Sequence, residues 1–394
     1  MVIGIDASRA FVPEPTGIHR YATEVCRGLM ATPPADLRLY WPGARPPAGA
    51  PPVLAGSTWR CLPLPRGWTA IRLRLELARR PPSLLFVPAY RLPPGRVPPS
   101  VVTIHGVEHR LTPESYTPGE RRRLERFVRD TLARARAVVT PSETTKADLV
   151  HLYGAAPGRV HVIVHGADRA ATPPPPPEAA RLRGRWLGTD PGPYLLTVGG
   201  HSTRKNLPFL IAAVAAARAA GCPAALVCTG VPEAQRALLR TAAQAAGIGD
   251  ACHLLPYLPP ADLEAFYAGA LGVAVASRYE GFGLPALDAM ARGVPVVGSG
   301  VGGVQELAAG AALLPPPDDL DAWRTALCRL AAEPDLRQHL AALGRRRAAP
   351  YTWEASVAAH AALLGRELAR TAGQATRDRG QPPARAAERP RRER

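Results

Sequence analysis

The chain has 394 residues, a length that suits two domains better than one. Its formal net charge of +17 favours anionic partners such as phosphates, and a hydrophobic content of 46% is enough to fill two cores. No apolar run approaches the roughly 20 residues of a membrane-spanning helix, and the six cysteines contain no CxxC pair, which argues against a zinc site and favours free thiols.

The first half of the chain alternates short apolar runs with segments of helical period, as in a parallel sheet with crossover helices. It enters a strand at once, without a secretory signal, so we expect a cytoplasmic protein. The pattern predicts strands at 2–5, 84–87, 101–104, 137–140 and 160–164 and helices at 17–30, 119–136 and 143–153.

A second series of the same kind follows the proline run 173–177, which we interpret as a stiff extended linker. Both series have the pattern of doubly wound sheets, in which ligands bind at the carboxyl ends of the strands. The second series predicts strands at 194–198, 224–229, 252–255, 272–276 and 294–298 and helices at 206–220, 232–246, 260–269, 285–292, 319–331, 334–348 and 353–370.

We therefore predict an α/β protein with two Rossmann-like domains facing a central cleft. The predicted first domain is 1–172, the linker 173–190 and the second domain 191–350. Residues 351–370 should form a helix that packs back towards the first domain. Residues 371–394, rich in Arg and Pro, should be a disordered basic tail.

The stretch 277–285 is the most informative of the chain. A predicted strand ends before it and a predicted helix begins at its last residue, so the helix start offers unpaired N–H groups to a diphosphate. Gly281 and Gly283 allow a close backbone approach to a ligand. Glu280 and Asp288 would flank the pocket with carboxylates, which accept hydrogen bonds from sugar hydroxyls. Together these residues predict a nucleotide-sugar site.

A second glycine-containing loop follows the first strand of the second domain. Gly199 and Gly200 let it pass close to a ligand, and Arg204 and Lys205 would place two cations beside a diphosphate. The alternative is a pair of surface cations at a helix start. The helix dipole disfavours cations there, which supports the functional interpretation.

In the first domain the signals are weaker. His105 ends a buried strand and either points into the cleft or is a satisfied core residue. Gly17 begins a helix and is a plausible point of close approach to a ligand. The arginines between Arg121 and Arg136 would either face anionic lipid headgroups on the inner face of a membrane or form a solvated basic helix.

These segments together resemble the retaining glycosyltransferases of family 4, a GT-B group that includes mannosyltransferases and glycogen synthase relatives. The similarity extends to about residue 370. The motifs that carry it are Thr16-Gly-Ile-His-Arg-Tyr21, the strand-end His105, the segment 140–148, the Arg-Lys-Asn loop at 204–206, the acid pair Glu280 and Asp288, and Gly302-Gly303-x-x-Glu306.

The resemblance implies that the second domain binds a nucleotide-sugar and that the first domain lies on the acceptor side. Glu280 would contact the donor sugar, Arg204 and Lys205 the diphosphate, and Asp288 the ribose. His105 and Gly17 would face the reacting centre. The backbone N–H groups of Phe282, Gly283 and Leu284, beside Gly281, would contact the phosphate or sugar.

Three departures from the family pattern matter. Asp288 stands where Glu is usual and its side chain is shorter by one methylene, so its ribose contact would be longer or bridged by water. Gly106 stands where Asp is frequent after the histidine and removes that carboxylate. Gly200 stands where many members carry Arg.

The implied reaction moves a hexose to an acceptor hydroxyl with retention of configuration and without a metal or other cofactor. GDP-mannose is the favoured donor, since the Arg-Lys-Asn loop and His105 resemble those of bacterial cell-surface mannosyltransferases. The acceptor would be a glycan or lipid-linked glycan. Two alternatives stay open: a GT-B sugar-nucleotide epimerase, and a basic nucleic-acid-binding protein, for which the sequence shows no known motif.

Overall fold

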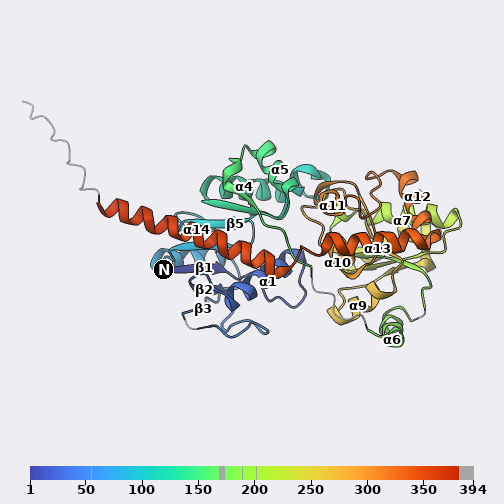
Figure 1. Cartoon of the computed structure of the whole chain (residues 1–394), viewed down its shortest axis with the longest axis horizontal. Helices are drawn as coiled ribbons and strands as arrows, with labels where there is room; N and C mark the ends of the chain where they lie inside the picture. The colour runs from blue at the N-terminus through green and yellow to red at the C-terminus, as the bar shows by residue number, and fades with distance from the viewer. Residues whose placement is uncertain (55, 168–173, 189, 201, 381–394) are drawn as a thin grey trace, which may run out of the picture.

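The computed structural model describes residues 1–54, 56–167, 174–188, 190–200 and 202–380. Within them the chain forms two α/β domains that lie side by side, with the amino terminus in one of them (Figure 1). The predicted fold class is confirmed: each domain has a wholly parallel sheet with helices packed on it.

The first domain has a seven-stranded sheet in the order β3-β2-β1-β4-β5-β6-β7. Two of its strands, β2 and β3, were not predicted. Both carry charged residues, Asp36 and Arg38 in β2 and Arg60 in β3, which interrupted the apolar runs. The strands are β1 (Val2–Asp6), β2 (Asp36–Trp41), β3 (Thr58–Cys61), β4 (Leu84–Val87), β5 (Ser100–Thr103), β6 (Ala137–Thr140) and β7 (Val160–Val162).

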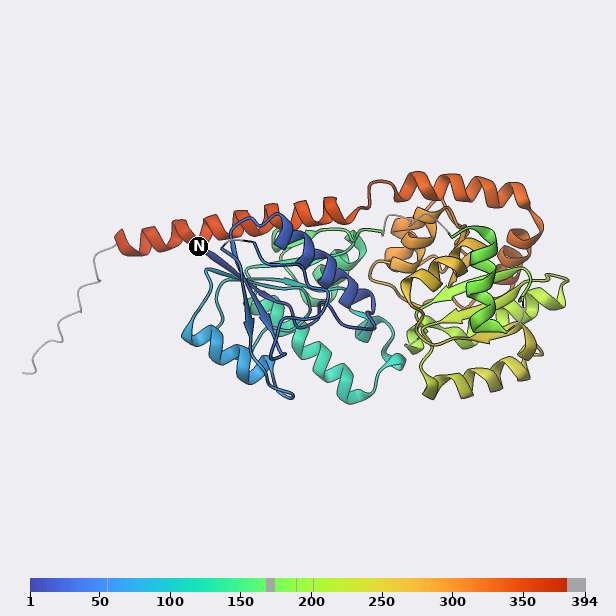
Figure 2. The ribbon, with the colours of Figure 1, turned by 90° about the horizontal axis from the view of Figure 1, so that it is seen from below.

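Two apolar layers cover this sheet. One contains α1 and the carboxyl-terminal helix α14 (Trp353–Gly380) with residues such as Tyr21 and Leu364, and the other contains α2, α4 and α5 with residues such as Leu77 and Val128. Figure 2 shows α2 and α4 along the edge opposite α14. The helical segments are α1 (Gly17–Ala31), η1 (Thr69–Leu73), α2 (Arg74–Arg79), α3 (Glu108–Leu111), η2 (Pro113–Ser115), α4 (Pro118–Arg134), α5 (Glu143–Tyr153) and η3 (Pro157–Arg159).

The second domain has a five-stranded sheet in the order β10-β9-β8-β11-β12, with an apolar layer on each face. Its strands are β8 (Tyr194–Val198), β9 (Ala225–Thr229), β10 (Cys252–Leu254), β11 (Gly272–Val275) and β12 (Val296–Gly298). Its helical segments are η4 (Thr203–Lys205), α7 (Leu207–Ala219), α8 (Glu233–Ala245), η5 (Gly249–Ala251), α9 (Pro260–Gly269), α10 (Leu284–Arg292), α11 (Gly302–Ala308), α12 (Leu320–Ala332) and α13 (Pro334–Ala348).

The interpretation of 173–177 as an extended linker was wrong at its end. Helix α6 (Pro176–Leu187) begins inside the proline run and packs on α9. Proline is tolerated in the first turn of a helix, because the N–H groups there have no intrahelical partner. The start of the predicted linker, Pro173, lies outside the described residues.

Helix α14 (Trp353–Gly380) returns from the second domain and packs on α1 and β4 of the first. It runs ten residues beyond the predicted end at 370, into the segment expected to be disordered. Arg136 Nη1 donates to Thr371 Oγ1 at 2.9 Å and so extends the packed part of the helix past that point. The rest of the predicted tail, 381–394, lies outside the described residues.

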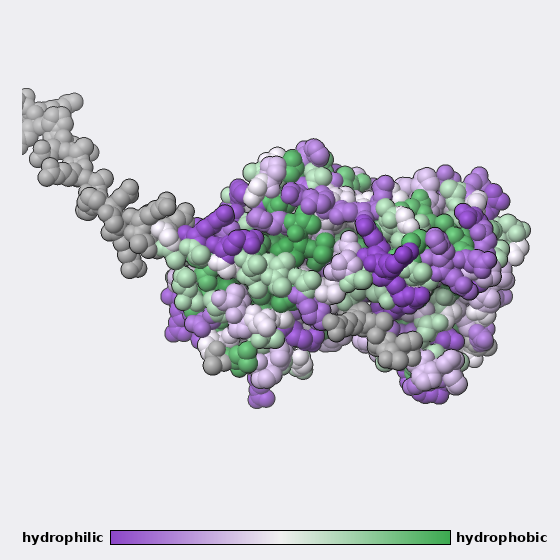
Figure 3. Space-filling model, viewed as in Figure 1, coloured by the Kyte–Doolittle hydropathy of each residue, from purple (hydrophilic) through white to green (hydrophobic). Residues whose placement is uncertain are grey.

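The two chain crossings between the domains run together, since Ala167 N donates to Tyr351 O at 2.9 Å. On the face drawn in Figure 3 the two domains are in contact. No helix in the described part of the chain has the length and apolar character needed to cross a bilayer.

Candidate active site

The loop between β11 and α10 presents Glu280 to the interior of the molecule. Its side chain is only 8% exposed, and Ser277 Oγ donates to its Oε1 at 2.6 Å. Gly283 has φ 102°, a left-handed conformation that glycine adopts without strain, and it precedes the first turn of α10. The loop therefore turns sharply into the helix and holds Glu280 in one orientation.

Arg204 and Lys205 both bind this carboxylate. Lys205 Nζ lies 2.6 Å from Glu280 Oε1, and Arg204 Nη1 lies 3.0 Å from Oε2. Both cations come from η4, which follows β8, the strand next to β11 in the sheet. The structure thus brings together the three residues that sequence reasoning placed in one site.

Burial alone would raise the pKa of Glu280. The charges of Arg204 and Lys205, with hydrogen bonds from Lys205 and Ser277, outweigh burial and hold the pKa well below its usual range. Burial lowers the pKa of Lys205, and Glu280 opposes that effect. The cluster is therefore an ionised carboxylate between two cations, and it carries one net positive charge.

The glycines of the predicted site lie close to these charges. Gly199 has φ 88°, and a Cβ added there would lie 4.0 Å from Lys205 Cε. A Cβ added at Gly281 would collide with the carbonyl oxygen of His105, so only glycine permits this contact between the domains. Gly17 lies beside Leu284, within 3.2 Å of its Cδ1 when a Cβ is added. The side chain of Phe282 is buried in the core and leaves only its backbone for a ligand.

Further hydrogen bonds hold the second domain against the first. Ser142 Oγ and Thr145 Oγ1 donate to the carbonyl of Gly281 at 2.6 and 3.1 Å. Glu306 accepts from the N–H groups of Glu143 and Thr144 at the start of α5, at 3.0 and 2.9 Å. The Gly-Gly-x-x-Glu motif therefore caps a helix of the opposite domain, a role that its sequence did not reveal.

Asp288 is engaged by a residue that sequence reasoning missed. Arg20 of α1 forms a bidentate pair with it, at 2.5 Å from Nη1 to Oδ2 and 3.0 Å from Nη2 to Oδ1. The guanidinium also lies 5.8 Å from the ring centre of Trp353. Arg20 was part of the quoted motif 16–21, but its partner is 268 positions away, so only the fold could identify the pair.

In the family, Asp frequently follows the strand-end histidine, and in this chain a different carboxylate lies near that position. Gly106 itself carries no carboxylate, but that of Glu108 folds back over it, so that a Cβ at Gly106 would lie 2.8 Å from Glu108 Oε1. Gly106 thus lacks the carboxylate, as the sequence indicated, and Glu108 brings another one beside it.

His105 is buried and belongs to a cluster of aromatic rings at the domain junction. Its ring centre lies 4.8 Å from Tyr21 and 5.6 Å from His165. His105 Nε2 donates to Pro88 O at 3.0 Å, so Nδ1 is left as an acceptor. Burial lowers the pKa of His105 to about 4, and the ring is neutral at physiological pH.

The comparisons with known proteins bear on this arrangement. Residues 15–171 match the family described as Glycosyltransferase Family 4, and residues 192–333 match Glycosyl transferases group 1. The chain belongs to the GT-B glycosyltransferases. Among the solved structures, sucrose-phosphate synthase from Thermosynechococcus elongatus superimposes with a TM-score of 0.75 at 22% identity, covering 94% of this chain and 100% of that one. WaaG, a glycosyltransferase involved in lipopolysaccharide biosynthesis, has a TM-score of 0.71 at 18% identity, covering 92% and 99%.

Two curated relatives of this GT-B chain are similar over part of their length. D-inositol 3-phosphate glycosyltransferase of Gordonia bronchialis is 31% identical over 242 residues, which are 59% of this chain and 52% of that relative. O-antigen chain mannosyltransferase B of Escherichia coli is 26% identical over 266 residues, 66% and 68% respectively. The chain spans about half the length of the first relative.

The Arg20–Asp288 pair should contribute measurably to the closed arrangement. Both side chains are largely buried, at 20% and 11% exposed, so we expect a coupling of about 1–3 kcal/mol in a double-mutant cycle of Arg20→Ala and Asp288→Asn. Denaturant unfolding of the four proteins measures it. The exposed pair of Arg27 and Glu24 is the control, with an expected coupling below about 0.5 kcal/mol. Equal coupling in both pairs would contradict this assignment.

The histidines of the junction should make the protein sensitive to acid. Burial lowers the pKa of His105 and of His360 to about 4 and that of His165 well below its usual value. Histidine in the unfolded chain has a pKa near 6.5. Below that pH the unfolded chain binds protons at these three histidines, whereas the folded chain leaves them neutral. Stability is thus complete above that value and falls as the pH drops towards 4, by roughly 3 kcal/mol for His105.

Thermal unfolding at a series of pH values tests this sign. The replacement His360→Leu should flatten the decline between pH 6.5 and 4, although it lowers stability at neutral pH because Tyr21 loses a partner. The matched control is His339→Leu at an exposed position on α13, and it should leave the slope unchanged. An unaltered slope in the His360 variant would refute the explanation.

Proposed function

We propose that this chain transfers a hexose, with mannose favoured, from a nucleoside diphosphate sugar to an acceptor hydroxyl in the synthesis of a cell-surface polysaccharide, lipopolysaccharide or glycolipid. The observation that carries the proposal is the buried cluster of Arg204, Lys205 and Glu280. A diphosphate gains negative charge as it leaves, and fixed cations stabilise that charge without reorganisation.

Each cation keeps donors for a ligand. Lys205 has three N–H bonds and uses one on Glu280, and Arg204 has five, of which Nη1 serves Glu280 and the Tyr279 carbonyl at 3.0 Å. We infer that the remaining donors and the start of α10 hold the diphosphate, while Glu280 accepts from a sugar hydroxyl.

The chemistry we propose is attack on the same face from which the diphosphate leaves, so that configuration is retained. The acceptor oxygen bonds to the anomeric carbon as the bond to the phosphate oxygen breaks, and the leaving phosphate takes the acceptor's proton. Neutral His105 would supply an acceptor at Nδ1 rather than a charge. No three His, Cys, Asp or Glu side chains in the described residues are grouped to hold a metal ion, and a metal-independent reaction remains our proposal.

The known proteins support parts of this proposal. The mannosyltransferase name of the Escherichia coli relative favours mannose. Anabaena HepE, crystallised with UDP and glucose, has a TM-score of 0.67 at 15% identity and covers 95% of this chain and 99% of that one. GDP and UDP are therefore the first two donor nucleotides to compare, and a binding measurement distinguishes them.

The proposal is tested by thermal stabilisation with a panel of GDP-, UDP-, ADP- and dTDP-sugars. One class should raise the melting temperature, because a ligand at a hundred times its Kd adds about 2.7 kcal/mol. Glu280→Gln should stay folded by circular dichroism but lose sugar turnover. If no nucleotide-sugar stabilises the protein, or if that variant turns over like the wild type, the proposal fails. Turnover of UDP-N-acetylglucosamine without an acceptor would favour the epimerase.

We further propose that the first domain contacts an anionic membrane. Four arginines of α4 are exposed, and their guanidinium groups form no ion pair or hydrogen bond within the described part of the chain: Arg121, Arg122, Arg123 and Arg126. On the same side of the sheet, η1 and α2 expose Ile71 and Leu75, at 55% and 44%. Arginines beside exposed aliphatic groups suit an anionic lipid surface, because the arginines meet the headgroups and the aliphatic groups enter the interface.

Vesicle flotation tests this contact. The wild type should bind phosphatidylcholine vesicles that contain phosphatidylglycerol, and not phosphatidylcholine alone. Replacing the four α4 arginines with Gln should reduce binding roughly a thousandfold, since each contributes about 1 kcal/mol. A control with the same loss of charge replaces exposed arginines of the second domain: Arg181, Arg240, Arg345 and Arg346. Equal loss in the control, or no vesicle binding by the wild type, would contradict the contact.

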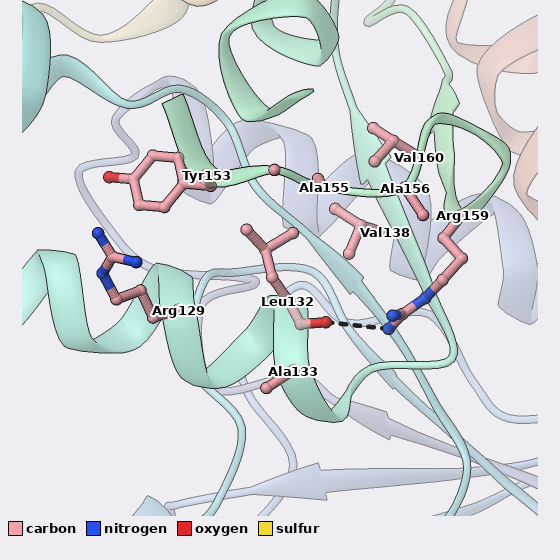
Figure 4. A pocket seen from close by; sticks show the side chains of 10 residues that line it. Arg129, Leu132, Ala133, Val138, Tyr153, Ala155, Ala156, Arg159 and Val160 are labelled. Atoms are coloured by element: carbon pink, nitrogen blue, oxygen red, sulfur yellow. Dashed lines mark hydrogen bonds between the residues drawn. The ribbon is translucent and has the colours of Figure 1, made fainter. Parts of the chain in front are cut away.

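The hollow on this side of the domain does not belong to the proposed active site. It measures about 350 Å³ and is lined by Leu132, Val138 and Tyr153 among others (Figure 4). Arg159 at its rim donates to the Leu132 carbonyl, and Arg129 is paired with Glu125. Its polar groups are therefore already satisfied.

A further inference from the structure

Glu108 brings a carboxylate from the first domain to the proposed active site. It begins α3, and its carboxylate lies over Gly106, directly after His105. Gly106 also lies beside the loop that carries Glu280, because a Cβ added at the next residue, Gly281, would lie 3.3 Å from Gly106 Cα. The carboxylate is thus held where the two domains meet beside Glu280.

Two tyrosines of the first domain accompany it. The ring of Tyr90 lies 5.7 Å from that of His105. Tyr116 follows η2, whose Ser115 carbonyl accepts from Thr203 Oγ1 at 3.3 Å, and Thr203 precedes Arg204. Tyr116 therefore lies near the loop that carries the cations, and Tyr90 lies beside His105.

The charges of Glu108 and Arg204 act on both phenols. Burial first, and then the charge of Glu108, raise the pKa of Tyr90 well above its usual value and that of Tyr116 to about 12. Arg204 opposes both shifts. The pKa of Arg204 is raised by Glu280 and next by Glu108, so the guanidinium responds to a carboxylate from each domain.

The polar atoms of this group have unused capacity. Within the described residues the Glu108 carboxylate and the hydroxyls of Tyr90 and Tyr116 form no hydrogen bond or ion pair, and all three side chains are partly exposed. The Glu108 charge disfavours a phosphate there, and Arg204 disfavours a cation. A neutral polyhydroxylated ligand fits, since the carboxylate accepts from hydroxyls and phenols both donate and accept.

We propose that Tyr90, Glu108 and Tyr116 form a subsite for the hydroxyl groups of the transferred sugar, opposite Glu280. The subsite rests on the proposed glycosyl transfer and names how the first domain takes part in it. Glu280 and Glu108 then hold the sugar from the two domains, while Arg204 lies near both carboxylates and next to the diphosphate. Sugar binding is thereby linked to contact between the domains.

The test compares a nucleotide-sugar with its nucleoside diphosphate, using the donor class that stabilises the wild type. In Glu108→Gln the Kd of the nucleotide-sugar should rise roughly tenfold to a hundredfold, because a hydrogen bond to a charged acceptor is lost. The Kd of the nucleoside diphosphate should not rise, because removing the Glu108 charge takes away a repulsion of the phosphates, and its retention shows that the variant is folded. Tyr116→Phe should weaken only the nucleotide-sugar, by a smaller factor.

Two matched controls accompany these variants. Glu114→Gln alters a carboxylate of the same segment that faces Arg278 at 3.9 Å, and Tyr153→Phe alters a phenol that already bonds Glu125. Both should keep wild-type affinities. The subsite is overturned if Glu108→Gln retains sugar affinity, or if it loses transfer while donor binding and donor hydrolysis persist, which would assign Glu108 to the acceptor. A wild type that binds no nucleotide-sugar would instead refute the proposed function.

Discussion

The ion cluster of Glu280 with Arg204 and Lys205 is the interaction on which the rest of the site depends. Three charges taken out of water are costly unless they are paired, and removing the carboxylate alone would leave two buried cations. Two cations and one anion leave a net positive charge. The cluster is therefore stable without a ligand and still attracts an anion, which suits the proposed binding and release of a diphosphate.

The same cluster sits at the junction of the two domains. The loop that carries Glu280 also presents the Gly281 carbonyl to Ser142 and Thr145, while Asp288 in the next helix pairs with Arg20. Contacts that position the site are thus also contacts that hold the domains together. A ligand that bound Asp288 or Glu280 as proposed would act on both at once, so its binding would be linked to the contact between the domains through shared side chains.

Sequence reasoning succeeded where a pattern is local. The limits of β8 and α5 were predicted correctly, because a buried strand and a capped helix each leave a short, regular signal. It failed for β2 and β3, where charged residues interrupt the apolar run, and for α6, which begins within prolines. It also placed Arg204, Lys205 and Glu280 close together, because the strands that precede them are parallel and end at the same edge of the sheet.

Other parts of the site required the fold. Arg20 is one of many arginines in the chain, and only the meeting of α1 with α10 gives it Asp288 as a partner. Glu108 was overlooked because Gly106 was taken as the loss of a carboxylate, whereas the chain folds one back from two positions further on. A linear motif does not reveal that a residue at another position supplies a group that the motif lacks.

The central claim is that the buried cations bind the diphosphate. Titration calorimetry of Lys205→Gln and the wild type, each with a nucleoside diphosphate and with the nucleoside alone, tests it most directly. The account requires the Kd of the diphosphate to rise roughly tenfold to a hundredfold while the affinity for the nucleoside stays the same. Unchanged diphosphate affinity in the variant would contradict it.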